Sequence, residues 1–263
     1  MTADYIGLPK SHSSPFSGIS GERCLLLLLD VGTDWLTAYP APRRDGETTY
    51  HAIAKHAGRS TIKYTHVDGA PELAQACTKH DILFERSAPY VHETNGLIEP
   101  FNRVEIFGGR VCLEQAGAPL CFWPYAVRHV AFARNIGDVG GRGVPYERRC
   151  KEPCIGLRIS FMARPRFTQQ PDIEKSGMVG KLEPSLIWGV LWGWSVHPGG
   201  KWNRRSYCVD LKEFVDMDFP VGKKVRIQEV FEVLFDEKEP VFFPHKALYD
   251  EAVGTPEGLR AFH

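Results

Sequence analysis

The chain has 263 residues, of which 43% are hydrophobic and 11% aromatic, and its formal net charge is zero. This composition suits one large domain or two ordinary ones, and it argues against a protein that is basic over its whole surface. Seven cysteines without a Cys-x-x-Cys motif favour free thiols in a reducing compartment over a disulfide framework. The run Leu25–Leu29 is too short to cross a bilayer and the first residues lack a signal pattern, so we expect a soluble, intracellular protein.

The hydrophobic pattern of the first half predicts strands and helices in an α/β order. The leucine run is apolar on both faces, as in a strand buried on two sides. The predicted elements are strands at Thr2–Ile6, Arg23–Val31 and Asp34–Tyr39, a helix at Gly46–Gly58, a strand at Thr61–Val67, a helix at Glu72–Lys79, a strand at Ile82–Glu85, and helices at Leu97–Ala116 and Pro119–Ala133.

The composition changes after Asn135, where a cluster of glycines with Pro145 predicts a linker. We expect a domain at residues 1–136, a linker at 137–156, a second domain at 157–245 and a tail at 246–263. The second domain is predicted to be a small antiparallel barrel or sheet. Its β-rich runs are Leu157–Ala163, Leu186–Trp194, Ser206–Asp210, Lys224–Ile227 and Val230–Phe235.

Three acidic residues suit metal-dependent chemistry at a phosphodiester. Asp4 lies on the first predicted strand, Asp68 ends a later one, and Glu99 stands at the start of the long helix. Such chemistry depends on carboxylates that hold divalent ions, which activate the attacking oxygen and stabilise the leaving oxygen. Mg²⁺ suits this role because it takes hard oxygen ligands.

Each of these residues also has a plainer explanation. Asp4 is compatible with a terminal surface charge, and Asp30, at the end of the leucine strand, is its rival for the first position. Asp68 before a glycine is typical of a turn, and Glu99 is favourable at a helix N-terminus. Glu105, farther along the long helix, is expected to be a solvated residue, as is Glu114.

The segment Arg103–Arg166 contains eleven Arg and Lys residues and five Asp and Glu residues, a local excess of six positive charges. A basic segment on a neutral protein suits contact with phosphates. A solvated, arginine-rich surface is the alternative explanation.

The stretch Ala88–Arg103, which contains Asn95-Gly96-Leu97-Ile98-Glu99, closely resembles the third-carboxylate motif of retroviral and copia-type retrotransposon integrases. Ala3–Pro9 and Val67–Leu73 are similar to the motifs around the first and second Asp of that family. The resemblance continues in Phe101–Arg103, Leu113–Pro119, Phe122–Ala126, Ala131–Asn135, Pro145–Arg148, Trp188–Trp194, Tyr207–Asp210 and Glu229–Glu237.

The resemblance implies an α/β RNase H-like core, with a mixed five-stranded sheet and flanking helices, and then the small all-β SH3-like domain of a Pol polyprotein. It implies an integrase that performs 3′-end processing and strand transfer on element and target DNA in the nucleus, as a homo-oligomer and without a membrane. Asp4, Asp68 and Glu99 would hold Mg²⁺ or Mn²⁺. The residues implied to contact DNA are His92, Asn95, Asn102 and Arg103.

The sequence departs from the family's pattern at three places. Asp68 and Glu99 are closer together than is usual, Gly69 stands where Asn is usual, and Pro100 directly follows Glu99. These departures favour one alternative function, a non-catalytic integrase relic that retains nucleic-acid binding. A second alternative is an RNase H-like nuclease that cuts DNA without joining it.

Overall fold

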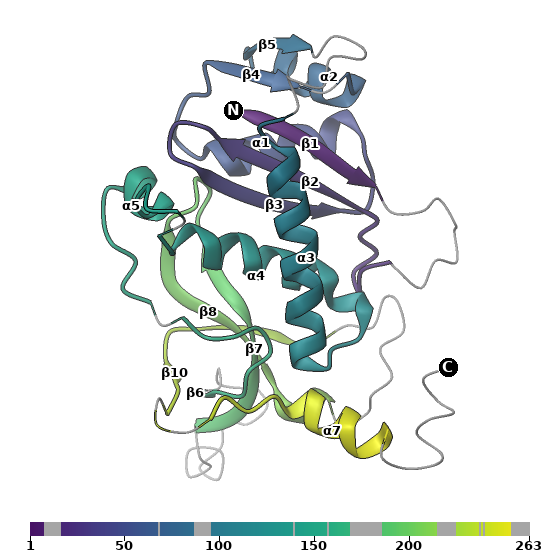
Figure 1. Ribbon diagram of the computed structural model, residues 1–263, viewed down its shortest axis with the longest axis vertical. Coiled ribbons are helices and arrows are strands. Elements are labelled where there is room, and N and C mark those ends of the chain that lie inside the picture. Colours follow the sequence, from purple (N-terminus) through teal and green to yellow (C-terminus); the bar gives the residue numbers. More distant parts are fainter. Residues whose placement is uncertain are drawn as a thin grey trace, which may run out of the picture.

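The described residues of the computed structural model form two five-stranded sheets and the helices that pack on them (Figure 1). The first sheet occupies the upper half of Figure 1 and the second sheet the lower half, with α4 (Trp123–Asn135) between them. The structure describes residues 1–7, 17–67, 69–86, 96–138, 140–156, 158–168, 186–214, 225–236, 238 and 240–253.

The first sheet is mixed, with the strand order β3-β2-β1-β4-β5. Its first three strands are antiparallel neighbours, whereas β4 runs parallel to β1 and β5 runs parallel to β4. The strands are β1 (Thr2–Gly7), β2 (Cys24–Asp30), β3 (Trp35–Ala41), β4 (Tyr64–Val67) and β5 (Leu83–Arg86). The expected mixed five-stranded sheet is therefore confirmed.

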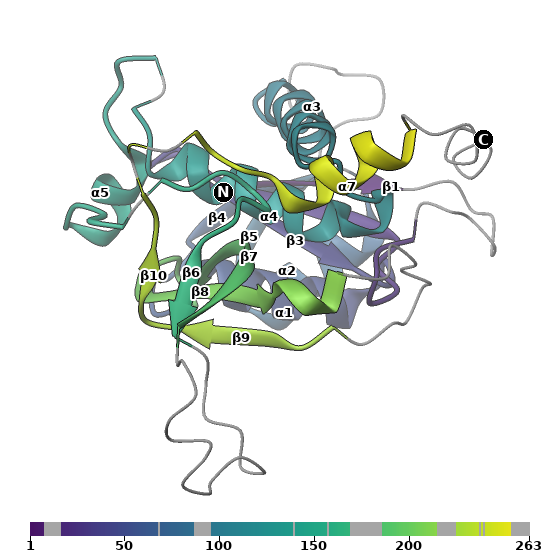
Figure 2. The same ribbon diagram turned by 90° about the horizontal axis from the view of Figure 1, so that it is seen from below.

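Helices cover both faces of this sheet because β2 is apolar on both sides. Its leucines at even positions belong to the core beneath α1 (Gly46–Ala57) and α2 (Pro71–Lys79). Its leucines at odd positions belong to the core beneath α4 and the start of α3 (Glu99–Ala116). Figure 2 shows α3 on one side of the sheet and α1 and α2 on the other. Burial of each leucine contributes about 1.5–3 kcal/mol, so β2 anchors all three layers.

The long helix α3 begins at Glu99, two residues later than predicted. Pro100 lies in its first turn, where the missing N–H has no partner to lose. The helix ends at Ala116, and the next residue, Gly117, caps it in a left-handed conformation with a φ of 62°. A short 3₁₀ helix, η2 (Leu120–Phe122), then leads into α4.

Two glycines allow α3 to pack closely on α4. A Cβ atom on Gly108 would lie 2.7 Å from Cγ1 of Val130, and one on Gly109 would lie 3.0 Å from Cγ1 of Val127. A side chain at Gly108 would therefore push the helices apart. These small residues fix where α3 lies over the sheet.

Glu105 lies in the same helix interface and is completely buried, so the prediction of a solvated residue was wrong. Neither of its carboxylate oxygens has a hydrogen-bond partner. Burial raises the pKa of Glu105 to about 8, although the positive charge of Arg134 acts in the opposite direction. Glu105 precedes the buried residues Gly109 and Leu113 at intervals of four, so helical spacing places it on the inner face. The predicted exposure of Glu114 is confirmed.

The second sheet is antiparallel throughout, with the strand order β10-β6-β7-β8-β9. The antiparallel sheet expected in this half is present, and its assignment as an SH3-like domain stays a prediction. Its strands are β6 (Arg166–Thr168), β7 (Leu186–Val196), β8 (Trp202–Asp210), β9 (Ile227–Val230) and β10 (Val233–Leu234), with a 3₁₀ helix, η4 (Leu211–Phe214), after β8.

The strand predicted at Leu157–Ala163 is not formed among the described residues 158–163, and β6 begins only at Arg166. The chain turns here, because Met162 has a positive φ of 55° and the Ala163 N–H donates to the Ser160 carbonyl. The apolar side chains are nevertheless buried against β7. Their burial explains the strand-like sequence pattern.

Both sheets pack on α4. Its Val127 and Ala131 belong to the core of the first sheet, whereas Ala126 belongs to a cluster with Trp192 of β7. Near the end of α4, the Asn135 amide donates to the Leu36 carbonyl at 2.7 Å and accepts from the Leu36 N–H at 3.0 Å. This side chain thereby pairs with the outer edge of β3, which would otherwise be open to another strand.

Two helices lie in segments expected to be a linker and a tail. The first is α5 (Pro145–Cys150), in which Arg148 pairs with Asp34 at 2.8 Å. The second is α7 (Pro244–Val253), which packs against the end of α3 near Gly117. The expected division into residues 1–136, 137–156, 157–245 and 246–263 stays a prediction.

None of the helices described is long and apolar enough to cross a membrane. All seven cysteines are free thiols.

Replacement of Glu105 by Gln should remove a pH dependence of stability. The raised pKa means that folding favours the protonated form, so this contribution is fully present below the ordinary pKa and is lost as the pH rises toward 8. Between about pH 5 and pH 8 we expect the wild-type free energy of unfolding to fall, relative to Glu105→Gln, by on the order of 3 kcal/mol. Urea denaturation at both pH values measures this difference.

Glu114→Gln is the matched control, since Glu114 is exposed on the same helix. Its free energy of unfolding should change between the two pH values by as much as that of the wild type. An equal pH dependence in wild type and Glu105→Gln would contradict the burial of an unpartnered carboxyl.

Candidate functional site

Asp4 projects from the face of the first sheet that α3 covers. Its neighbours Ala3 and Tyr5 belong to the core beneath α1 and α2, while Ile6 belongs to the core on the opposite face. Since side chains alternate along a strand, Asp4 lies on the same face as Ile6. It is half-buried there.

A hydrogen bond joins Asp4 to α3. The Asn102 Nδ2 atom donates to the Asp4 Oδ2 atom at 2.6 Å, although the two residues are 98 positions apart. Glu99 is exposed and precedes Asn102 by three residues, so both lie on one side of the first helical turns. Asp4 is therefore hydrogen-bonded to the residue that follows Glu99 by three positions on α3.

The third predicted carboxylate, Asp68, lies outside the described residues, as do His92 and Asn95. The strand before Asp68 is described. Its last residue, Val67, is the partner of Ala3 in the parallel pairing of β4 with β1. The end of β4 is therefore next to the part of β1 that carries Asp4.

The described side chains offer the hard oxygen atoms that Mg²⁺ or Mn²⁺ prefers. Asp4 and Glu99 are carboxylates, and the Asn102 Oδ1 atom is buried without a hydrogen-bond partner. Among the residues described, no three His, Cys, Asp or Glu side chains form a cluster able to hold a metal. The donor atoms fit a divalent ion in kind, and a complete set would require Asp68.

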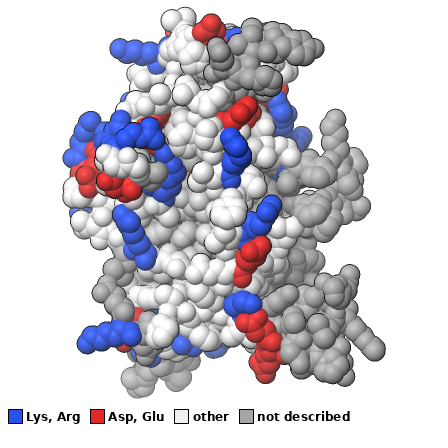
Figure 3. Space-filling view, in the orientation of Figure 1, with Lys and Arg blue, Asp and Glu red and all other residues white. Residues whose placement is uncertain are grey.

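Arg103 follows Glu99 by four residues and is exposed. Neither Arg103 nor Arg110 makes a hydrogen bond or ion pair with a described residue. Figure 3 shows basic and acidic side chains mixed along α3, without a continuous basic surface over the described part of this face. Exposed apolar side chains, including Val104 and Phe107, lie on the same helix.

Many side chains of the basic segment Arg103–Arg166 are used inside the protein. Those with internal hydrogen bonds, ion pairs or stacking on an aromatic ring include Arg134, Arg148, Arg149, Arg158, Arg164 and Arg166. Much of the local excess of positive charge therefore stabilises the fold, and contact of this segment with phosphates stays a prediction.

Asp30, the rival of Asp4, has a structural role. It accepts hydrogen bonds from the Gly32 N–H and the Thr33 hydroxyl, and it pairs with Arg149 at 3.0 Å. These partners hold the pKa of Asp30 below its usual range despite the opposing effect of burial. Arg149 also donates to the carbonyls of His56 and Gly199, so this ion pair joins the two sheets.

No protein-family model matches this chain. Among solved structures, the catalytic core domain of BIV integrase is similar, with a TM-score of 0.42 and 15% sequence identity. The similarity covers 57% of this chain and 92% of that domain.

Asn102→Asp should destabilise the protein at neutral pH, because it places a second carboxylate at the position that donates to Asp4. Two ionised carboxylates repel each other, and we expect a loss of about 2 kcal/mol in the free energy of unfolding. The loss should shrink when acid protonates one of them. Urea denaturation at neutral pH and near pH 4 measures the change.

Asn102→Ala is the control, since it removes the hydrogen bond without adding a charge, and its loss should depend little on pH. Equal stabilities of Asn102→Asp and Asn102→Ala at neutral pH would show that Asn102 does not contact Asp4.

Proposed function

We propose that this chain is a metal-dependent polynucleotidyl transferase of the integrase kind, with an RNase H-like core. The observation that supports this proposal most directly is the hydrogen bond from Asn102 to Asp4. It joins the strand of the first carboxylate to the helix of the third, and this is the juxtaposition that the resemblance to integrases requires. Asp68 would complete the set.

In this proposal Asp4, Asp68 and Glu99 would hold two Mg²⁺ or Mn²⁺ ions. Such ions, when bound, activate the attacking oxygen and stabilise the leaving one. The protein itself positions the reactants. Asn102 would orient the Asp4 carboxylate, and Arg103 would contact a DNA phosphate, so DNA binding should weaken as salt rises.

The finer parts of the proposal come from the resemblance. We infer 3′-end processing and strand transfer by a copia-type retrotransposon integrase, with the second sheet as its SH3-like domain and with DNA as its partner. His92, Asn95 and Asn102 would lie close to that DNA. A homo-oligomer belongs to the same inference.

A non-catalytic relic is the second candidate, since three departures from the family's pattern favour it. Pro100, however, does not disturb α3, because it fits the first turn and leaves the helix unbroken from Glu99 to Ala116. The shorter spacing and Gly69 still favour the relic.

The decisive experiment is Mg²⁺- or Mn²⁺-dependent joining of a labelled DNA end to a plasmid. We expect the wild type to join DNA and each of Asp4→Asn, Asp68→Asn and Glu99→Gln to reduce joining by about 100-fold or more, because each removes a metal ligand. Glu114→Gln, on the exposed side of the same helix, should join DNA as the wild type does.

The three candidate functions give different results in this assay. A folded wild-type protein that binds DNA without cutting or joining it would identify the relic. Cut DNA without joined product would identify a nuclease. Joining that survives all three substitutions would exclude the proposed carboxylates.

A further inference from the structure

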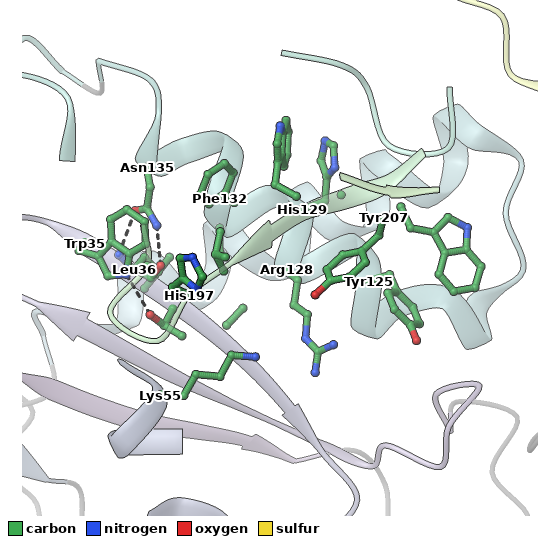
Figure 4. A pocket seen from close by; sticks show the side chains of 18 of the residues that line it. Trp35, Leu36, Lys55, Tyr125, Arg128, His129, Phe132, Asn135, His197 and Tyr207 are labelled. Carbon is green, nitrogen blue, oxygen red and sulfur yellow. Dashed lines mark hydrogen bonds between the residues drawn. The ribbon is translucent and has the colours of Figure 1, made fainter. Parts of the chain in front are cut away.

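A cavity of about 360 Å³ lies between the two sheets, on the far side of β2 from Asp4. Its walls come from β3, α1, α4 and the strands β7, β8 and β9 of the second sheet (Figure 4). Sites for small ligands commonly have volumes of about 300–1,000 Å³ and combine apolar walls with a few polar groups. The size and position of this cavity therefore suit a small molecule.

Two positively charged side chains face this space. Lys55 reaches it from the last turn of α1 and Arg128 from α4, and their charged ends point to the same region in Figure 4. Both residues are solvent-exposed, and the pKa of Lys55 is lowered by partial desolvation of its ammonium group and by the positive charge of Arg128. In the described part of the chain, neither makes an ion pair or a side-chain hydrogen bond. Their unbalanced charge suits an anion.

The carboxylate in the cavity wall does not supply the missing negative charge. Glu229 accepts hydrogen bonds from Ser195 and from Asn203, and it pairs with Arg205 at 3.4 Å. These contacts hold the pKa of Glu229 below its usual range. Its charge is thus balanced by side chains of the second sheet.

Aromatic and neutral polar groups complete the walls. Tyr125, Tyr207 and Trp194 offer aromatic surfaces, and the phenol of Tyr207 points towards the space between the two cations (Figure 4). The Nδ1 atom of His129 is buried without a hydrogen-bond partner. A ligand with a planar ring and hydrogen-bonding atoms would contact these groups favourably.

We propose that this cavity binds a nucleoside monophosphate, with its phosphate between Lys55 and Arg128 and its base against the aromatic wall. The charge of the phosphate matches the two cations, and the planar base matches Tyr125 and Tyr207. This site is separate from the proposed catalytic carboxylates, because β2 lies between β1 and β3.

Calorimetric titration of the full chain with AMP, adenosine and inorganic phosphate tests the site. We expect AMP to bind about tenfold more tightly than either fragment. Lys55→Gln and Arg128→Gln should each weaken AMP binding about tenfold, because each removes one charged contact. Arg128→Lys should retain much of the affinity. Arg110→Gln, which removes an exposed arginine of α3 outside this cavity, should bind AMP as the wild type does.

Absence of AMP binding, or binding of adenosine or phosphate as tight as that of AMP, would overturn the proposal. So would Lys55→Gln and Arg128→Gln variants that both fold, as far-UV circular dichroism shows, and both bind AMP as the wild type does. A short oligothymidylate that binds more tightly than AMP, and loses affinity in Lys55→Gln, would assign the cavity to a DNA strand and exclude the small molecule.

Discussion

The packing of α4 between the two sheets is the contact on which the rest of the structure depends. Val127 and Ala131 pack on the first sheet, and Ala126 packs in the cluster of Trp192. A helix that is apolar on opposite sides is stable only when both sides are covered. The sheets are therefore held as one unit by α4, with the Asn135 amide and the Asp30–Arg149 ion pair as polar links.

The position of α4 sets the position of α3, and α3 sets the candidate site. Gly108 and Gly109 bring α3 close to α4, and one to two turns earlier Asn102 reaches Asp4. Glu105 lies between these two contacts, completely buried and without a hydrogen-bond partner. Burial of such a group costs stability, and exceptions to ordinary packing rules concentrate near functional sites. The buried, unpartnered carboxyl group of Glu105 is therefore consistent with a functional role for α3.

Local sequence patterns predicted the first sheet because its strands are short and bounded by turn residues. The leucine run in β2 and the helical spacing in α1 are signals of this kind. The hydrophobic pattern wrongly predicted a strand at Leu157–Ala163, where the described apolar side chains are buried without strand pairing and Met162 lies in a turn. It also missed α5, whose six residues are too few for a clear helical period.

The candidate site was predictable only in part, because local motifs show single residues and do not show contacts between distant segments. Motifs indicated Asp4 and Glu99, but the hydrogen bond from Asn102 depends on a contact across 98 positions. The role of Asp30 likewise depends on Arg149, which lies 119 positions away. Pairings of this range are set by how the sheets pack on α4, and no local pattern encodes them. The same packing leaves Lys55 and Arg128 facing one cavity, although they come from separate helices. A site formed where helices and sheets meet is thus visible only in the folded chain.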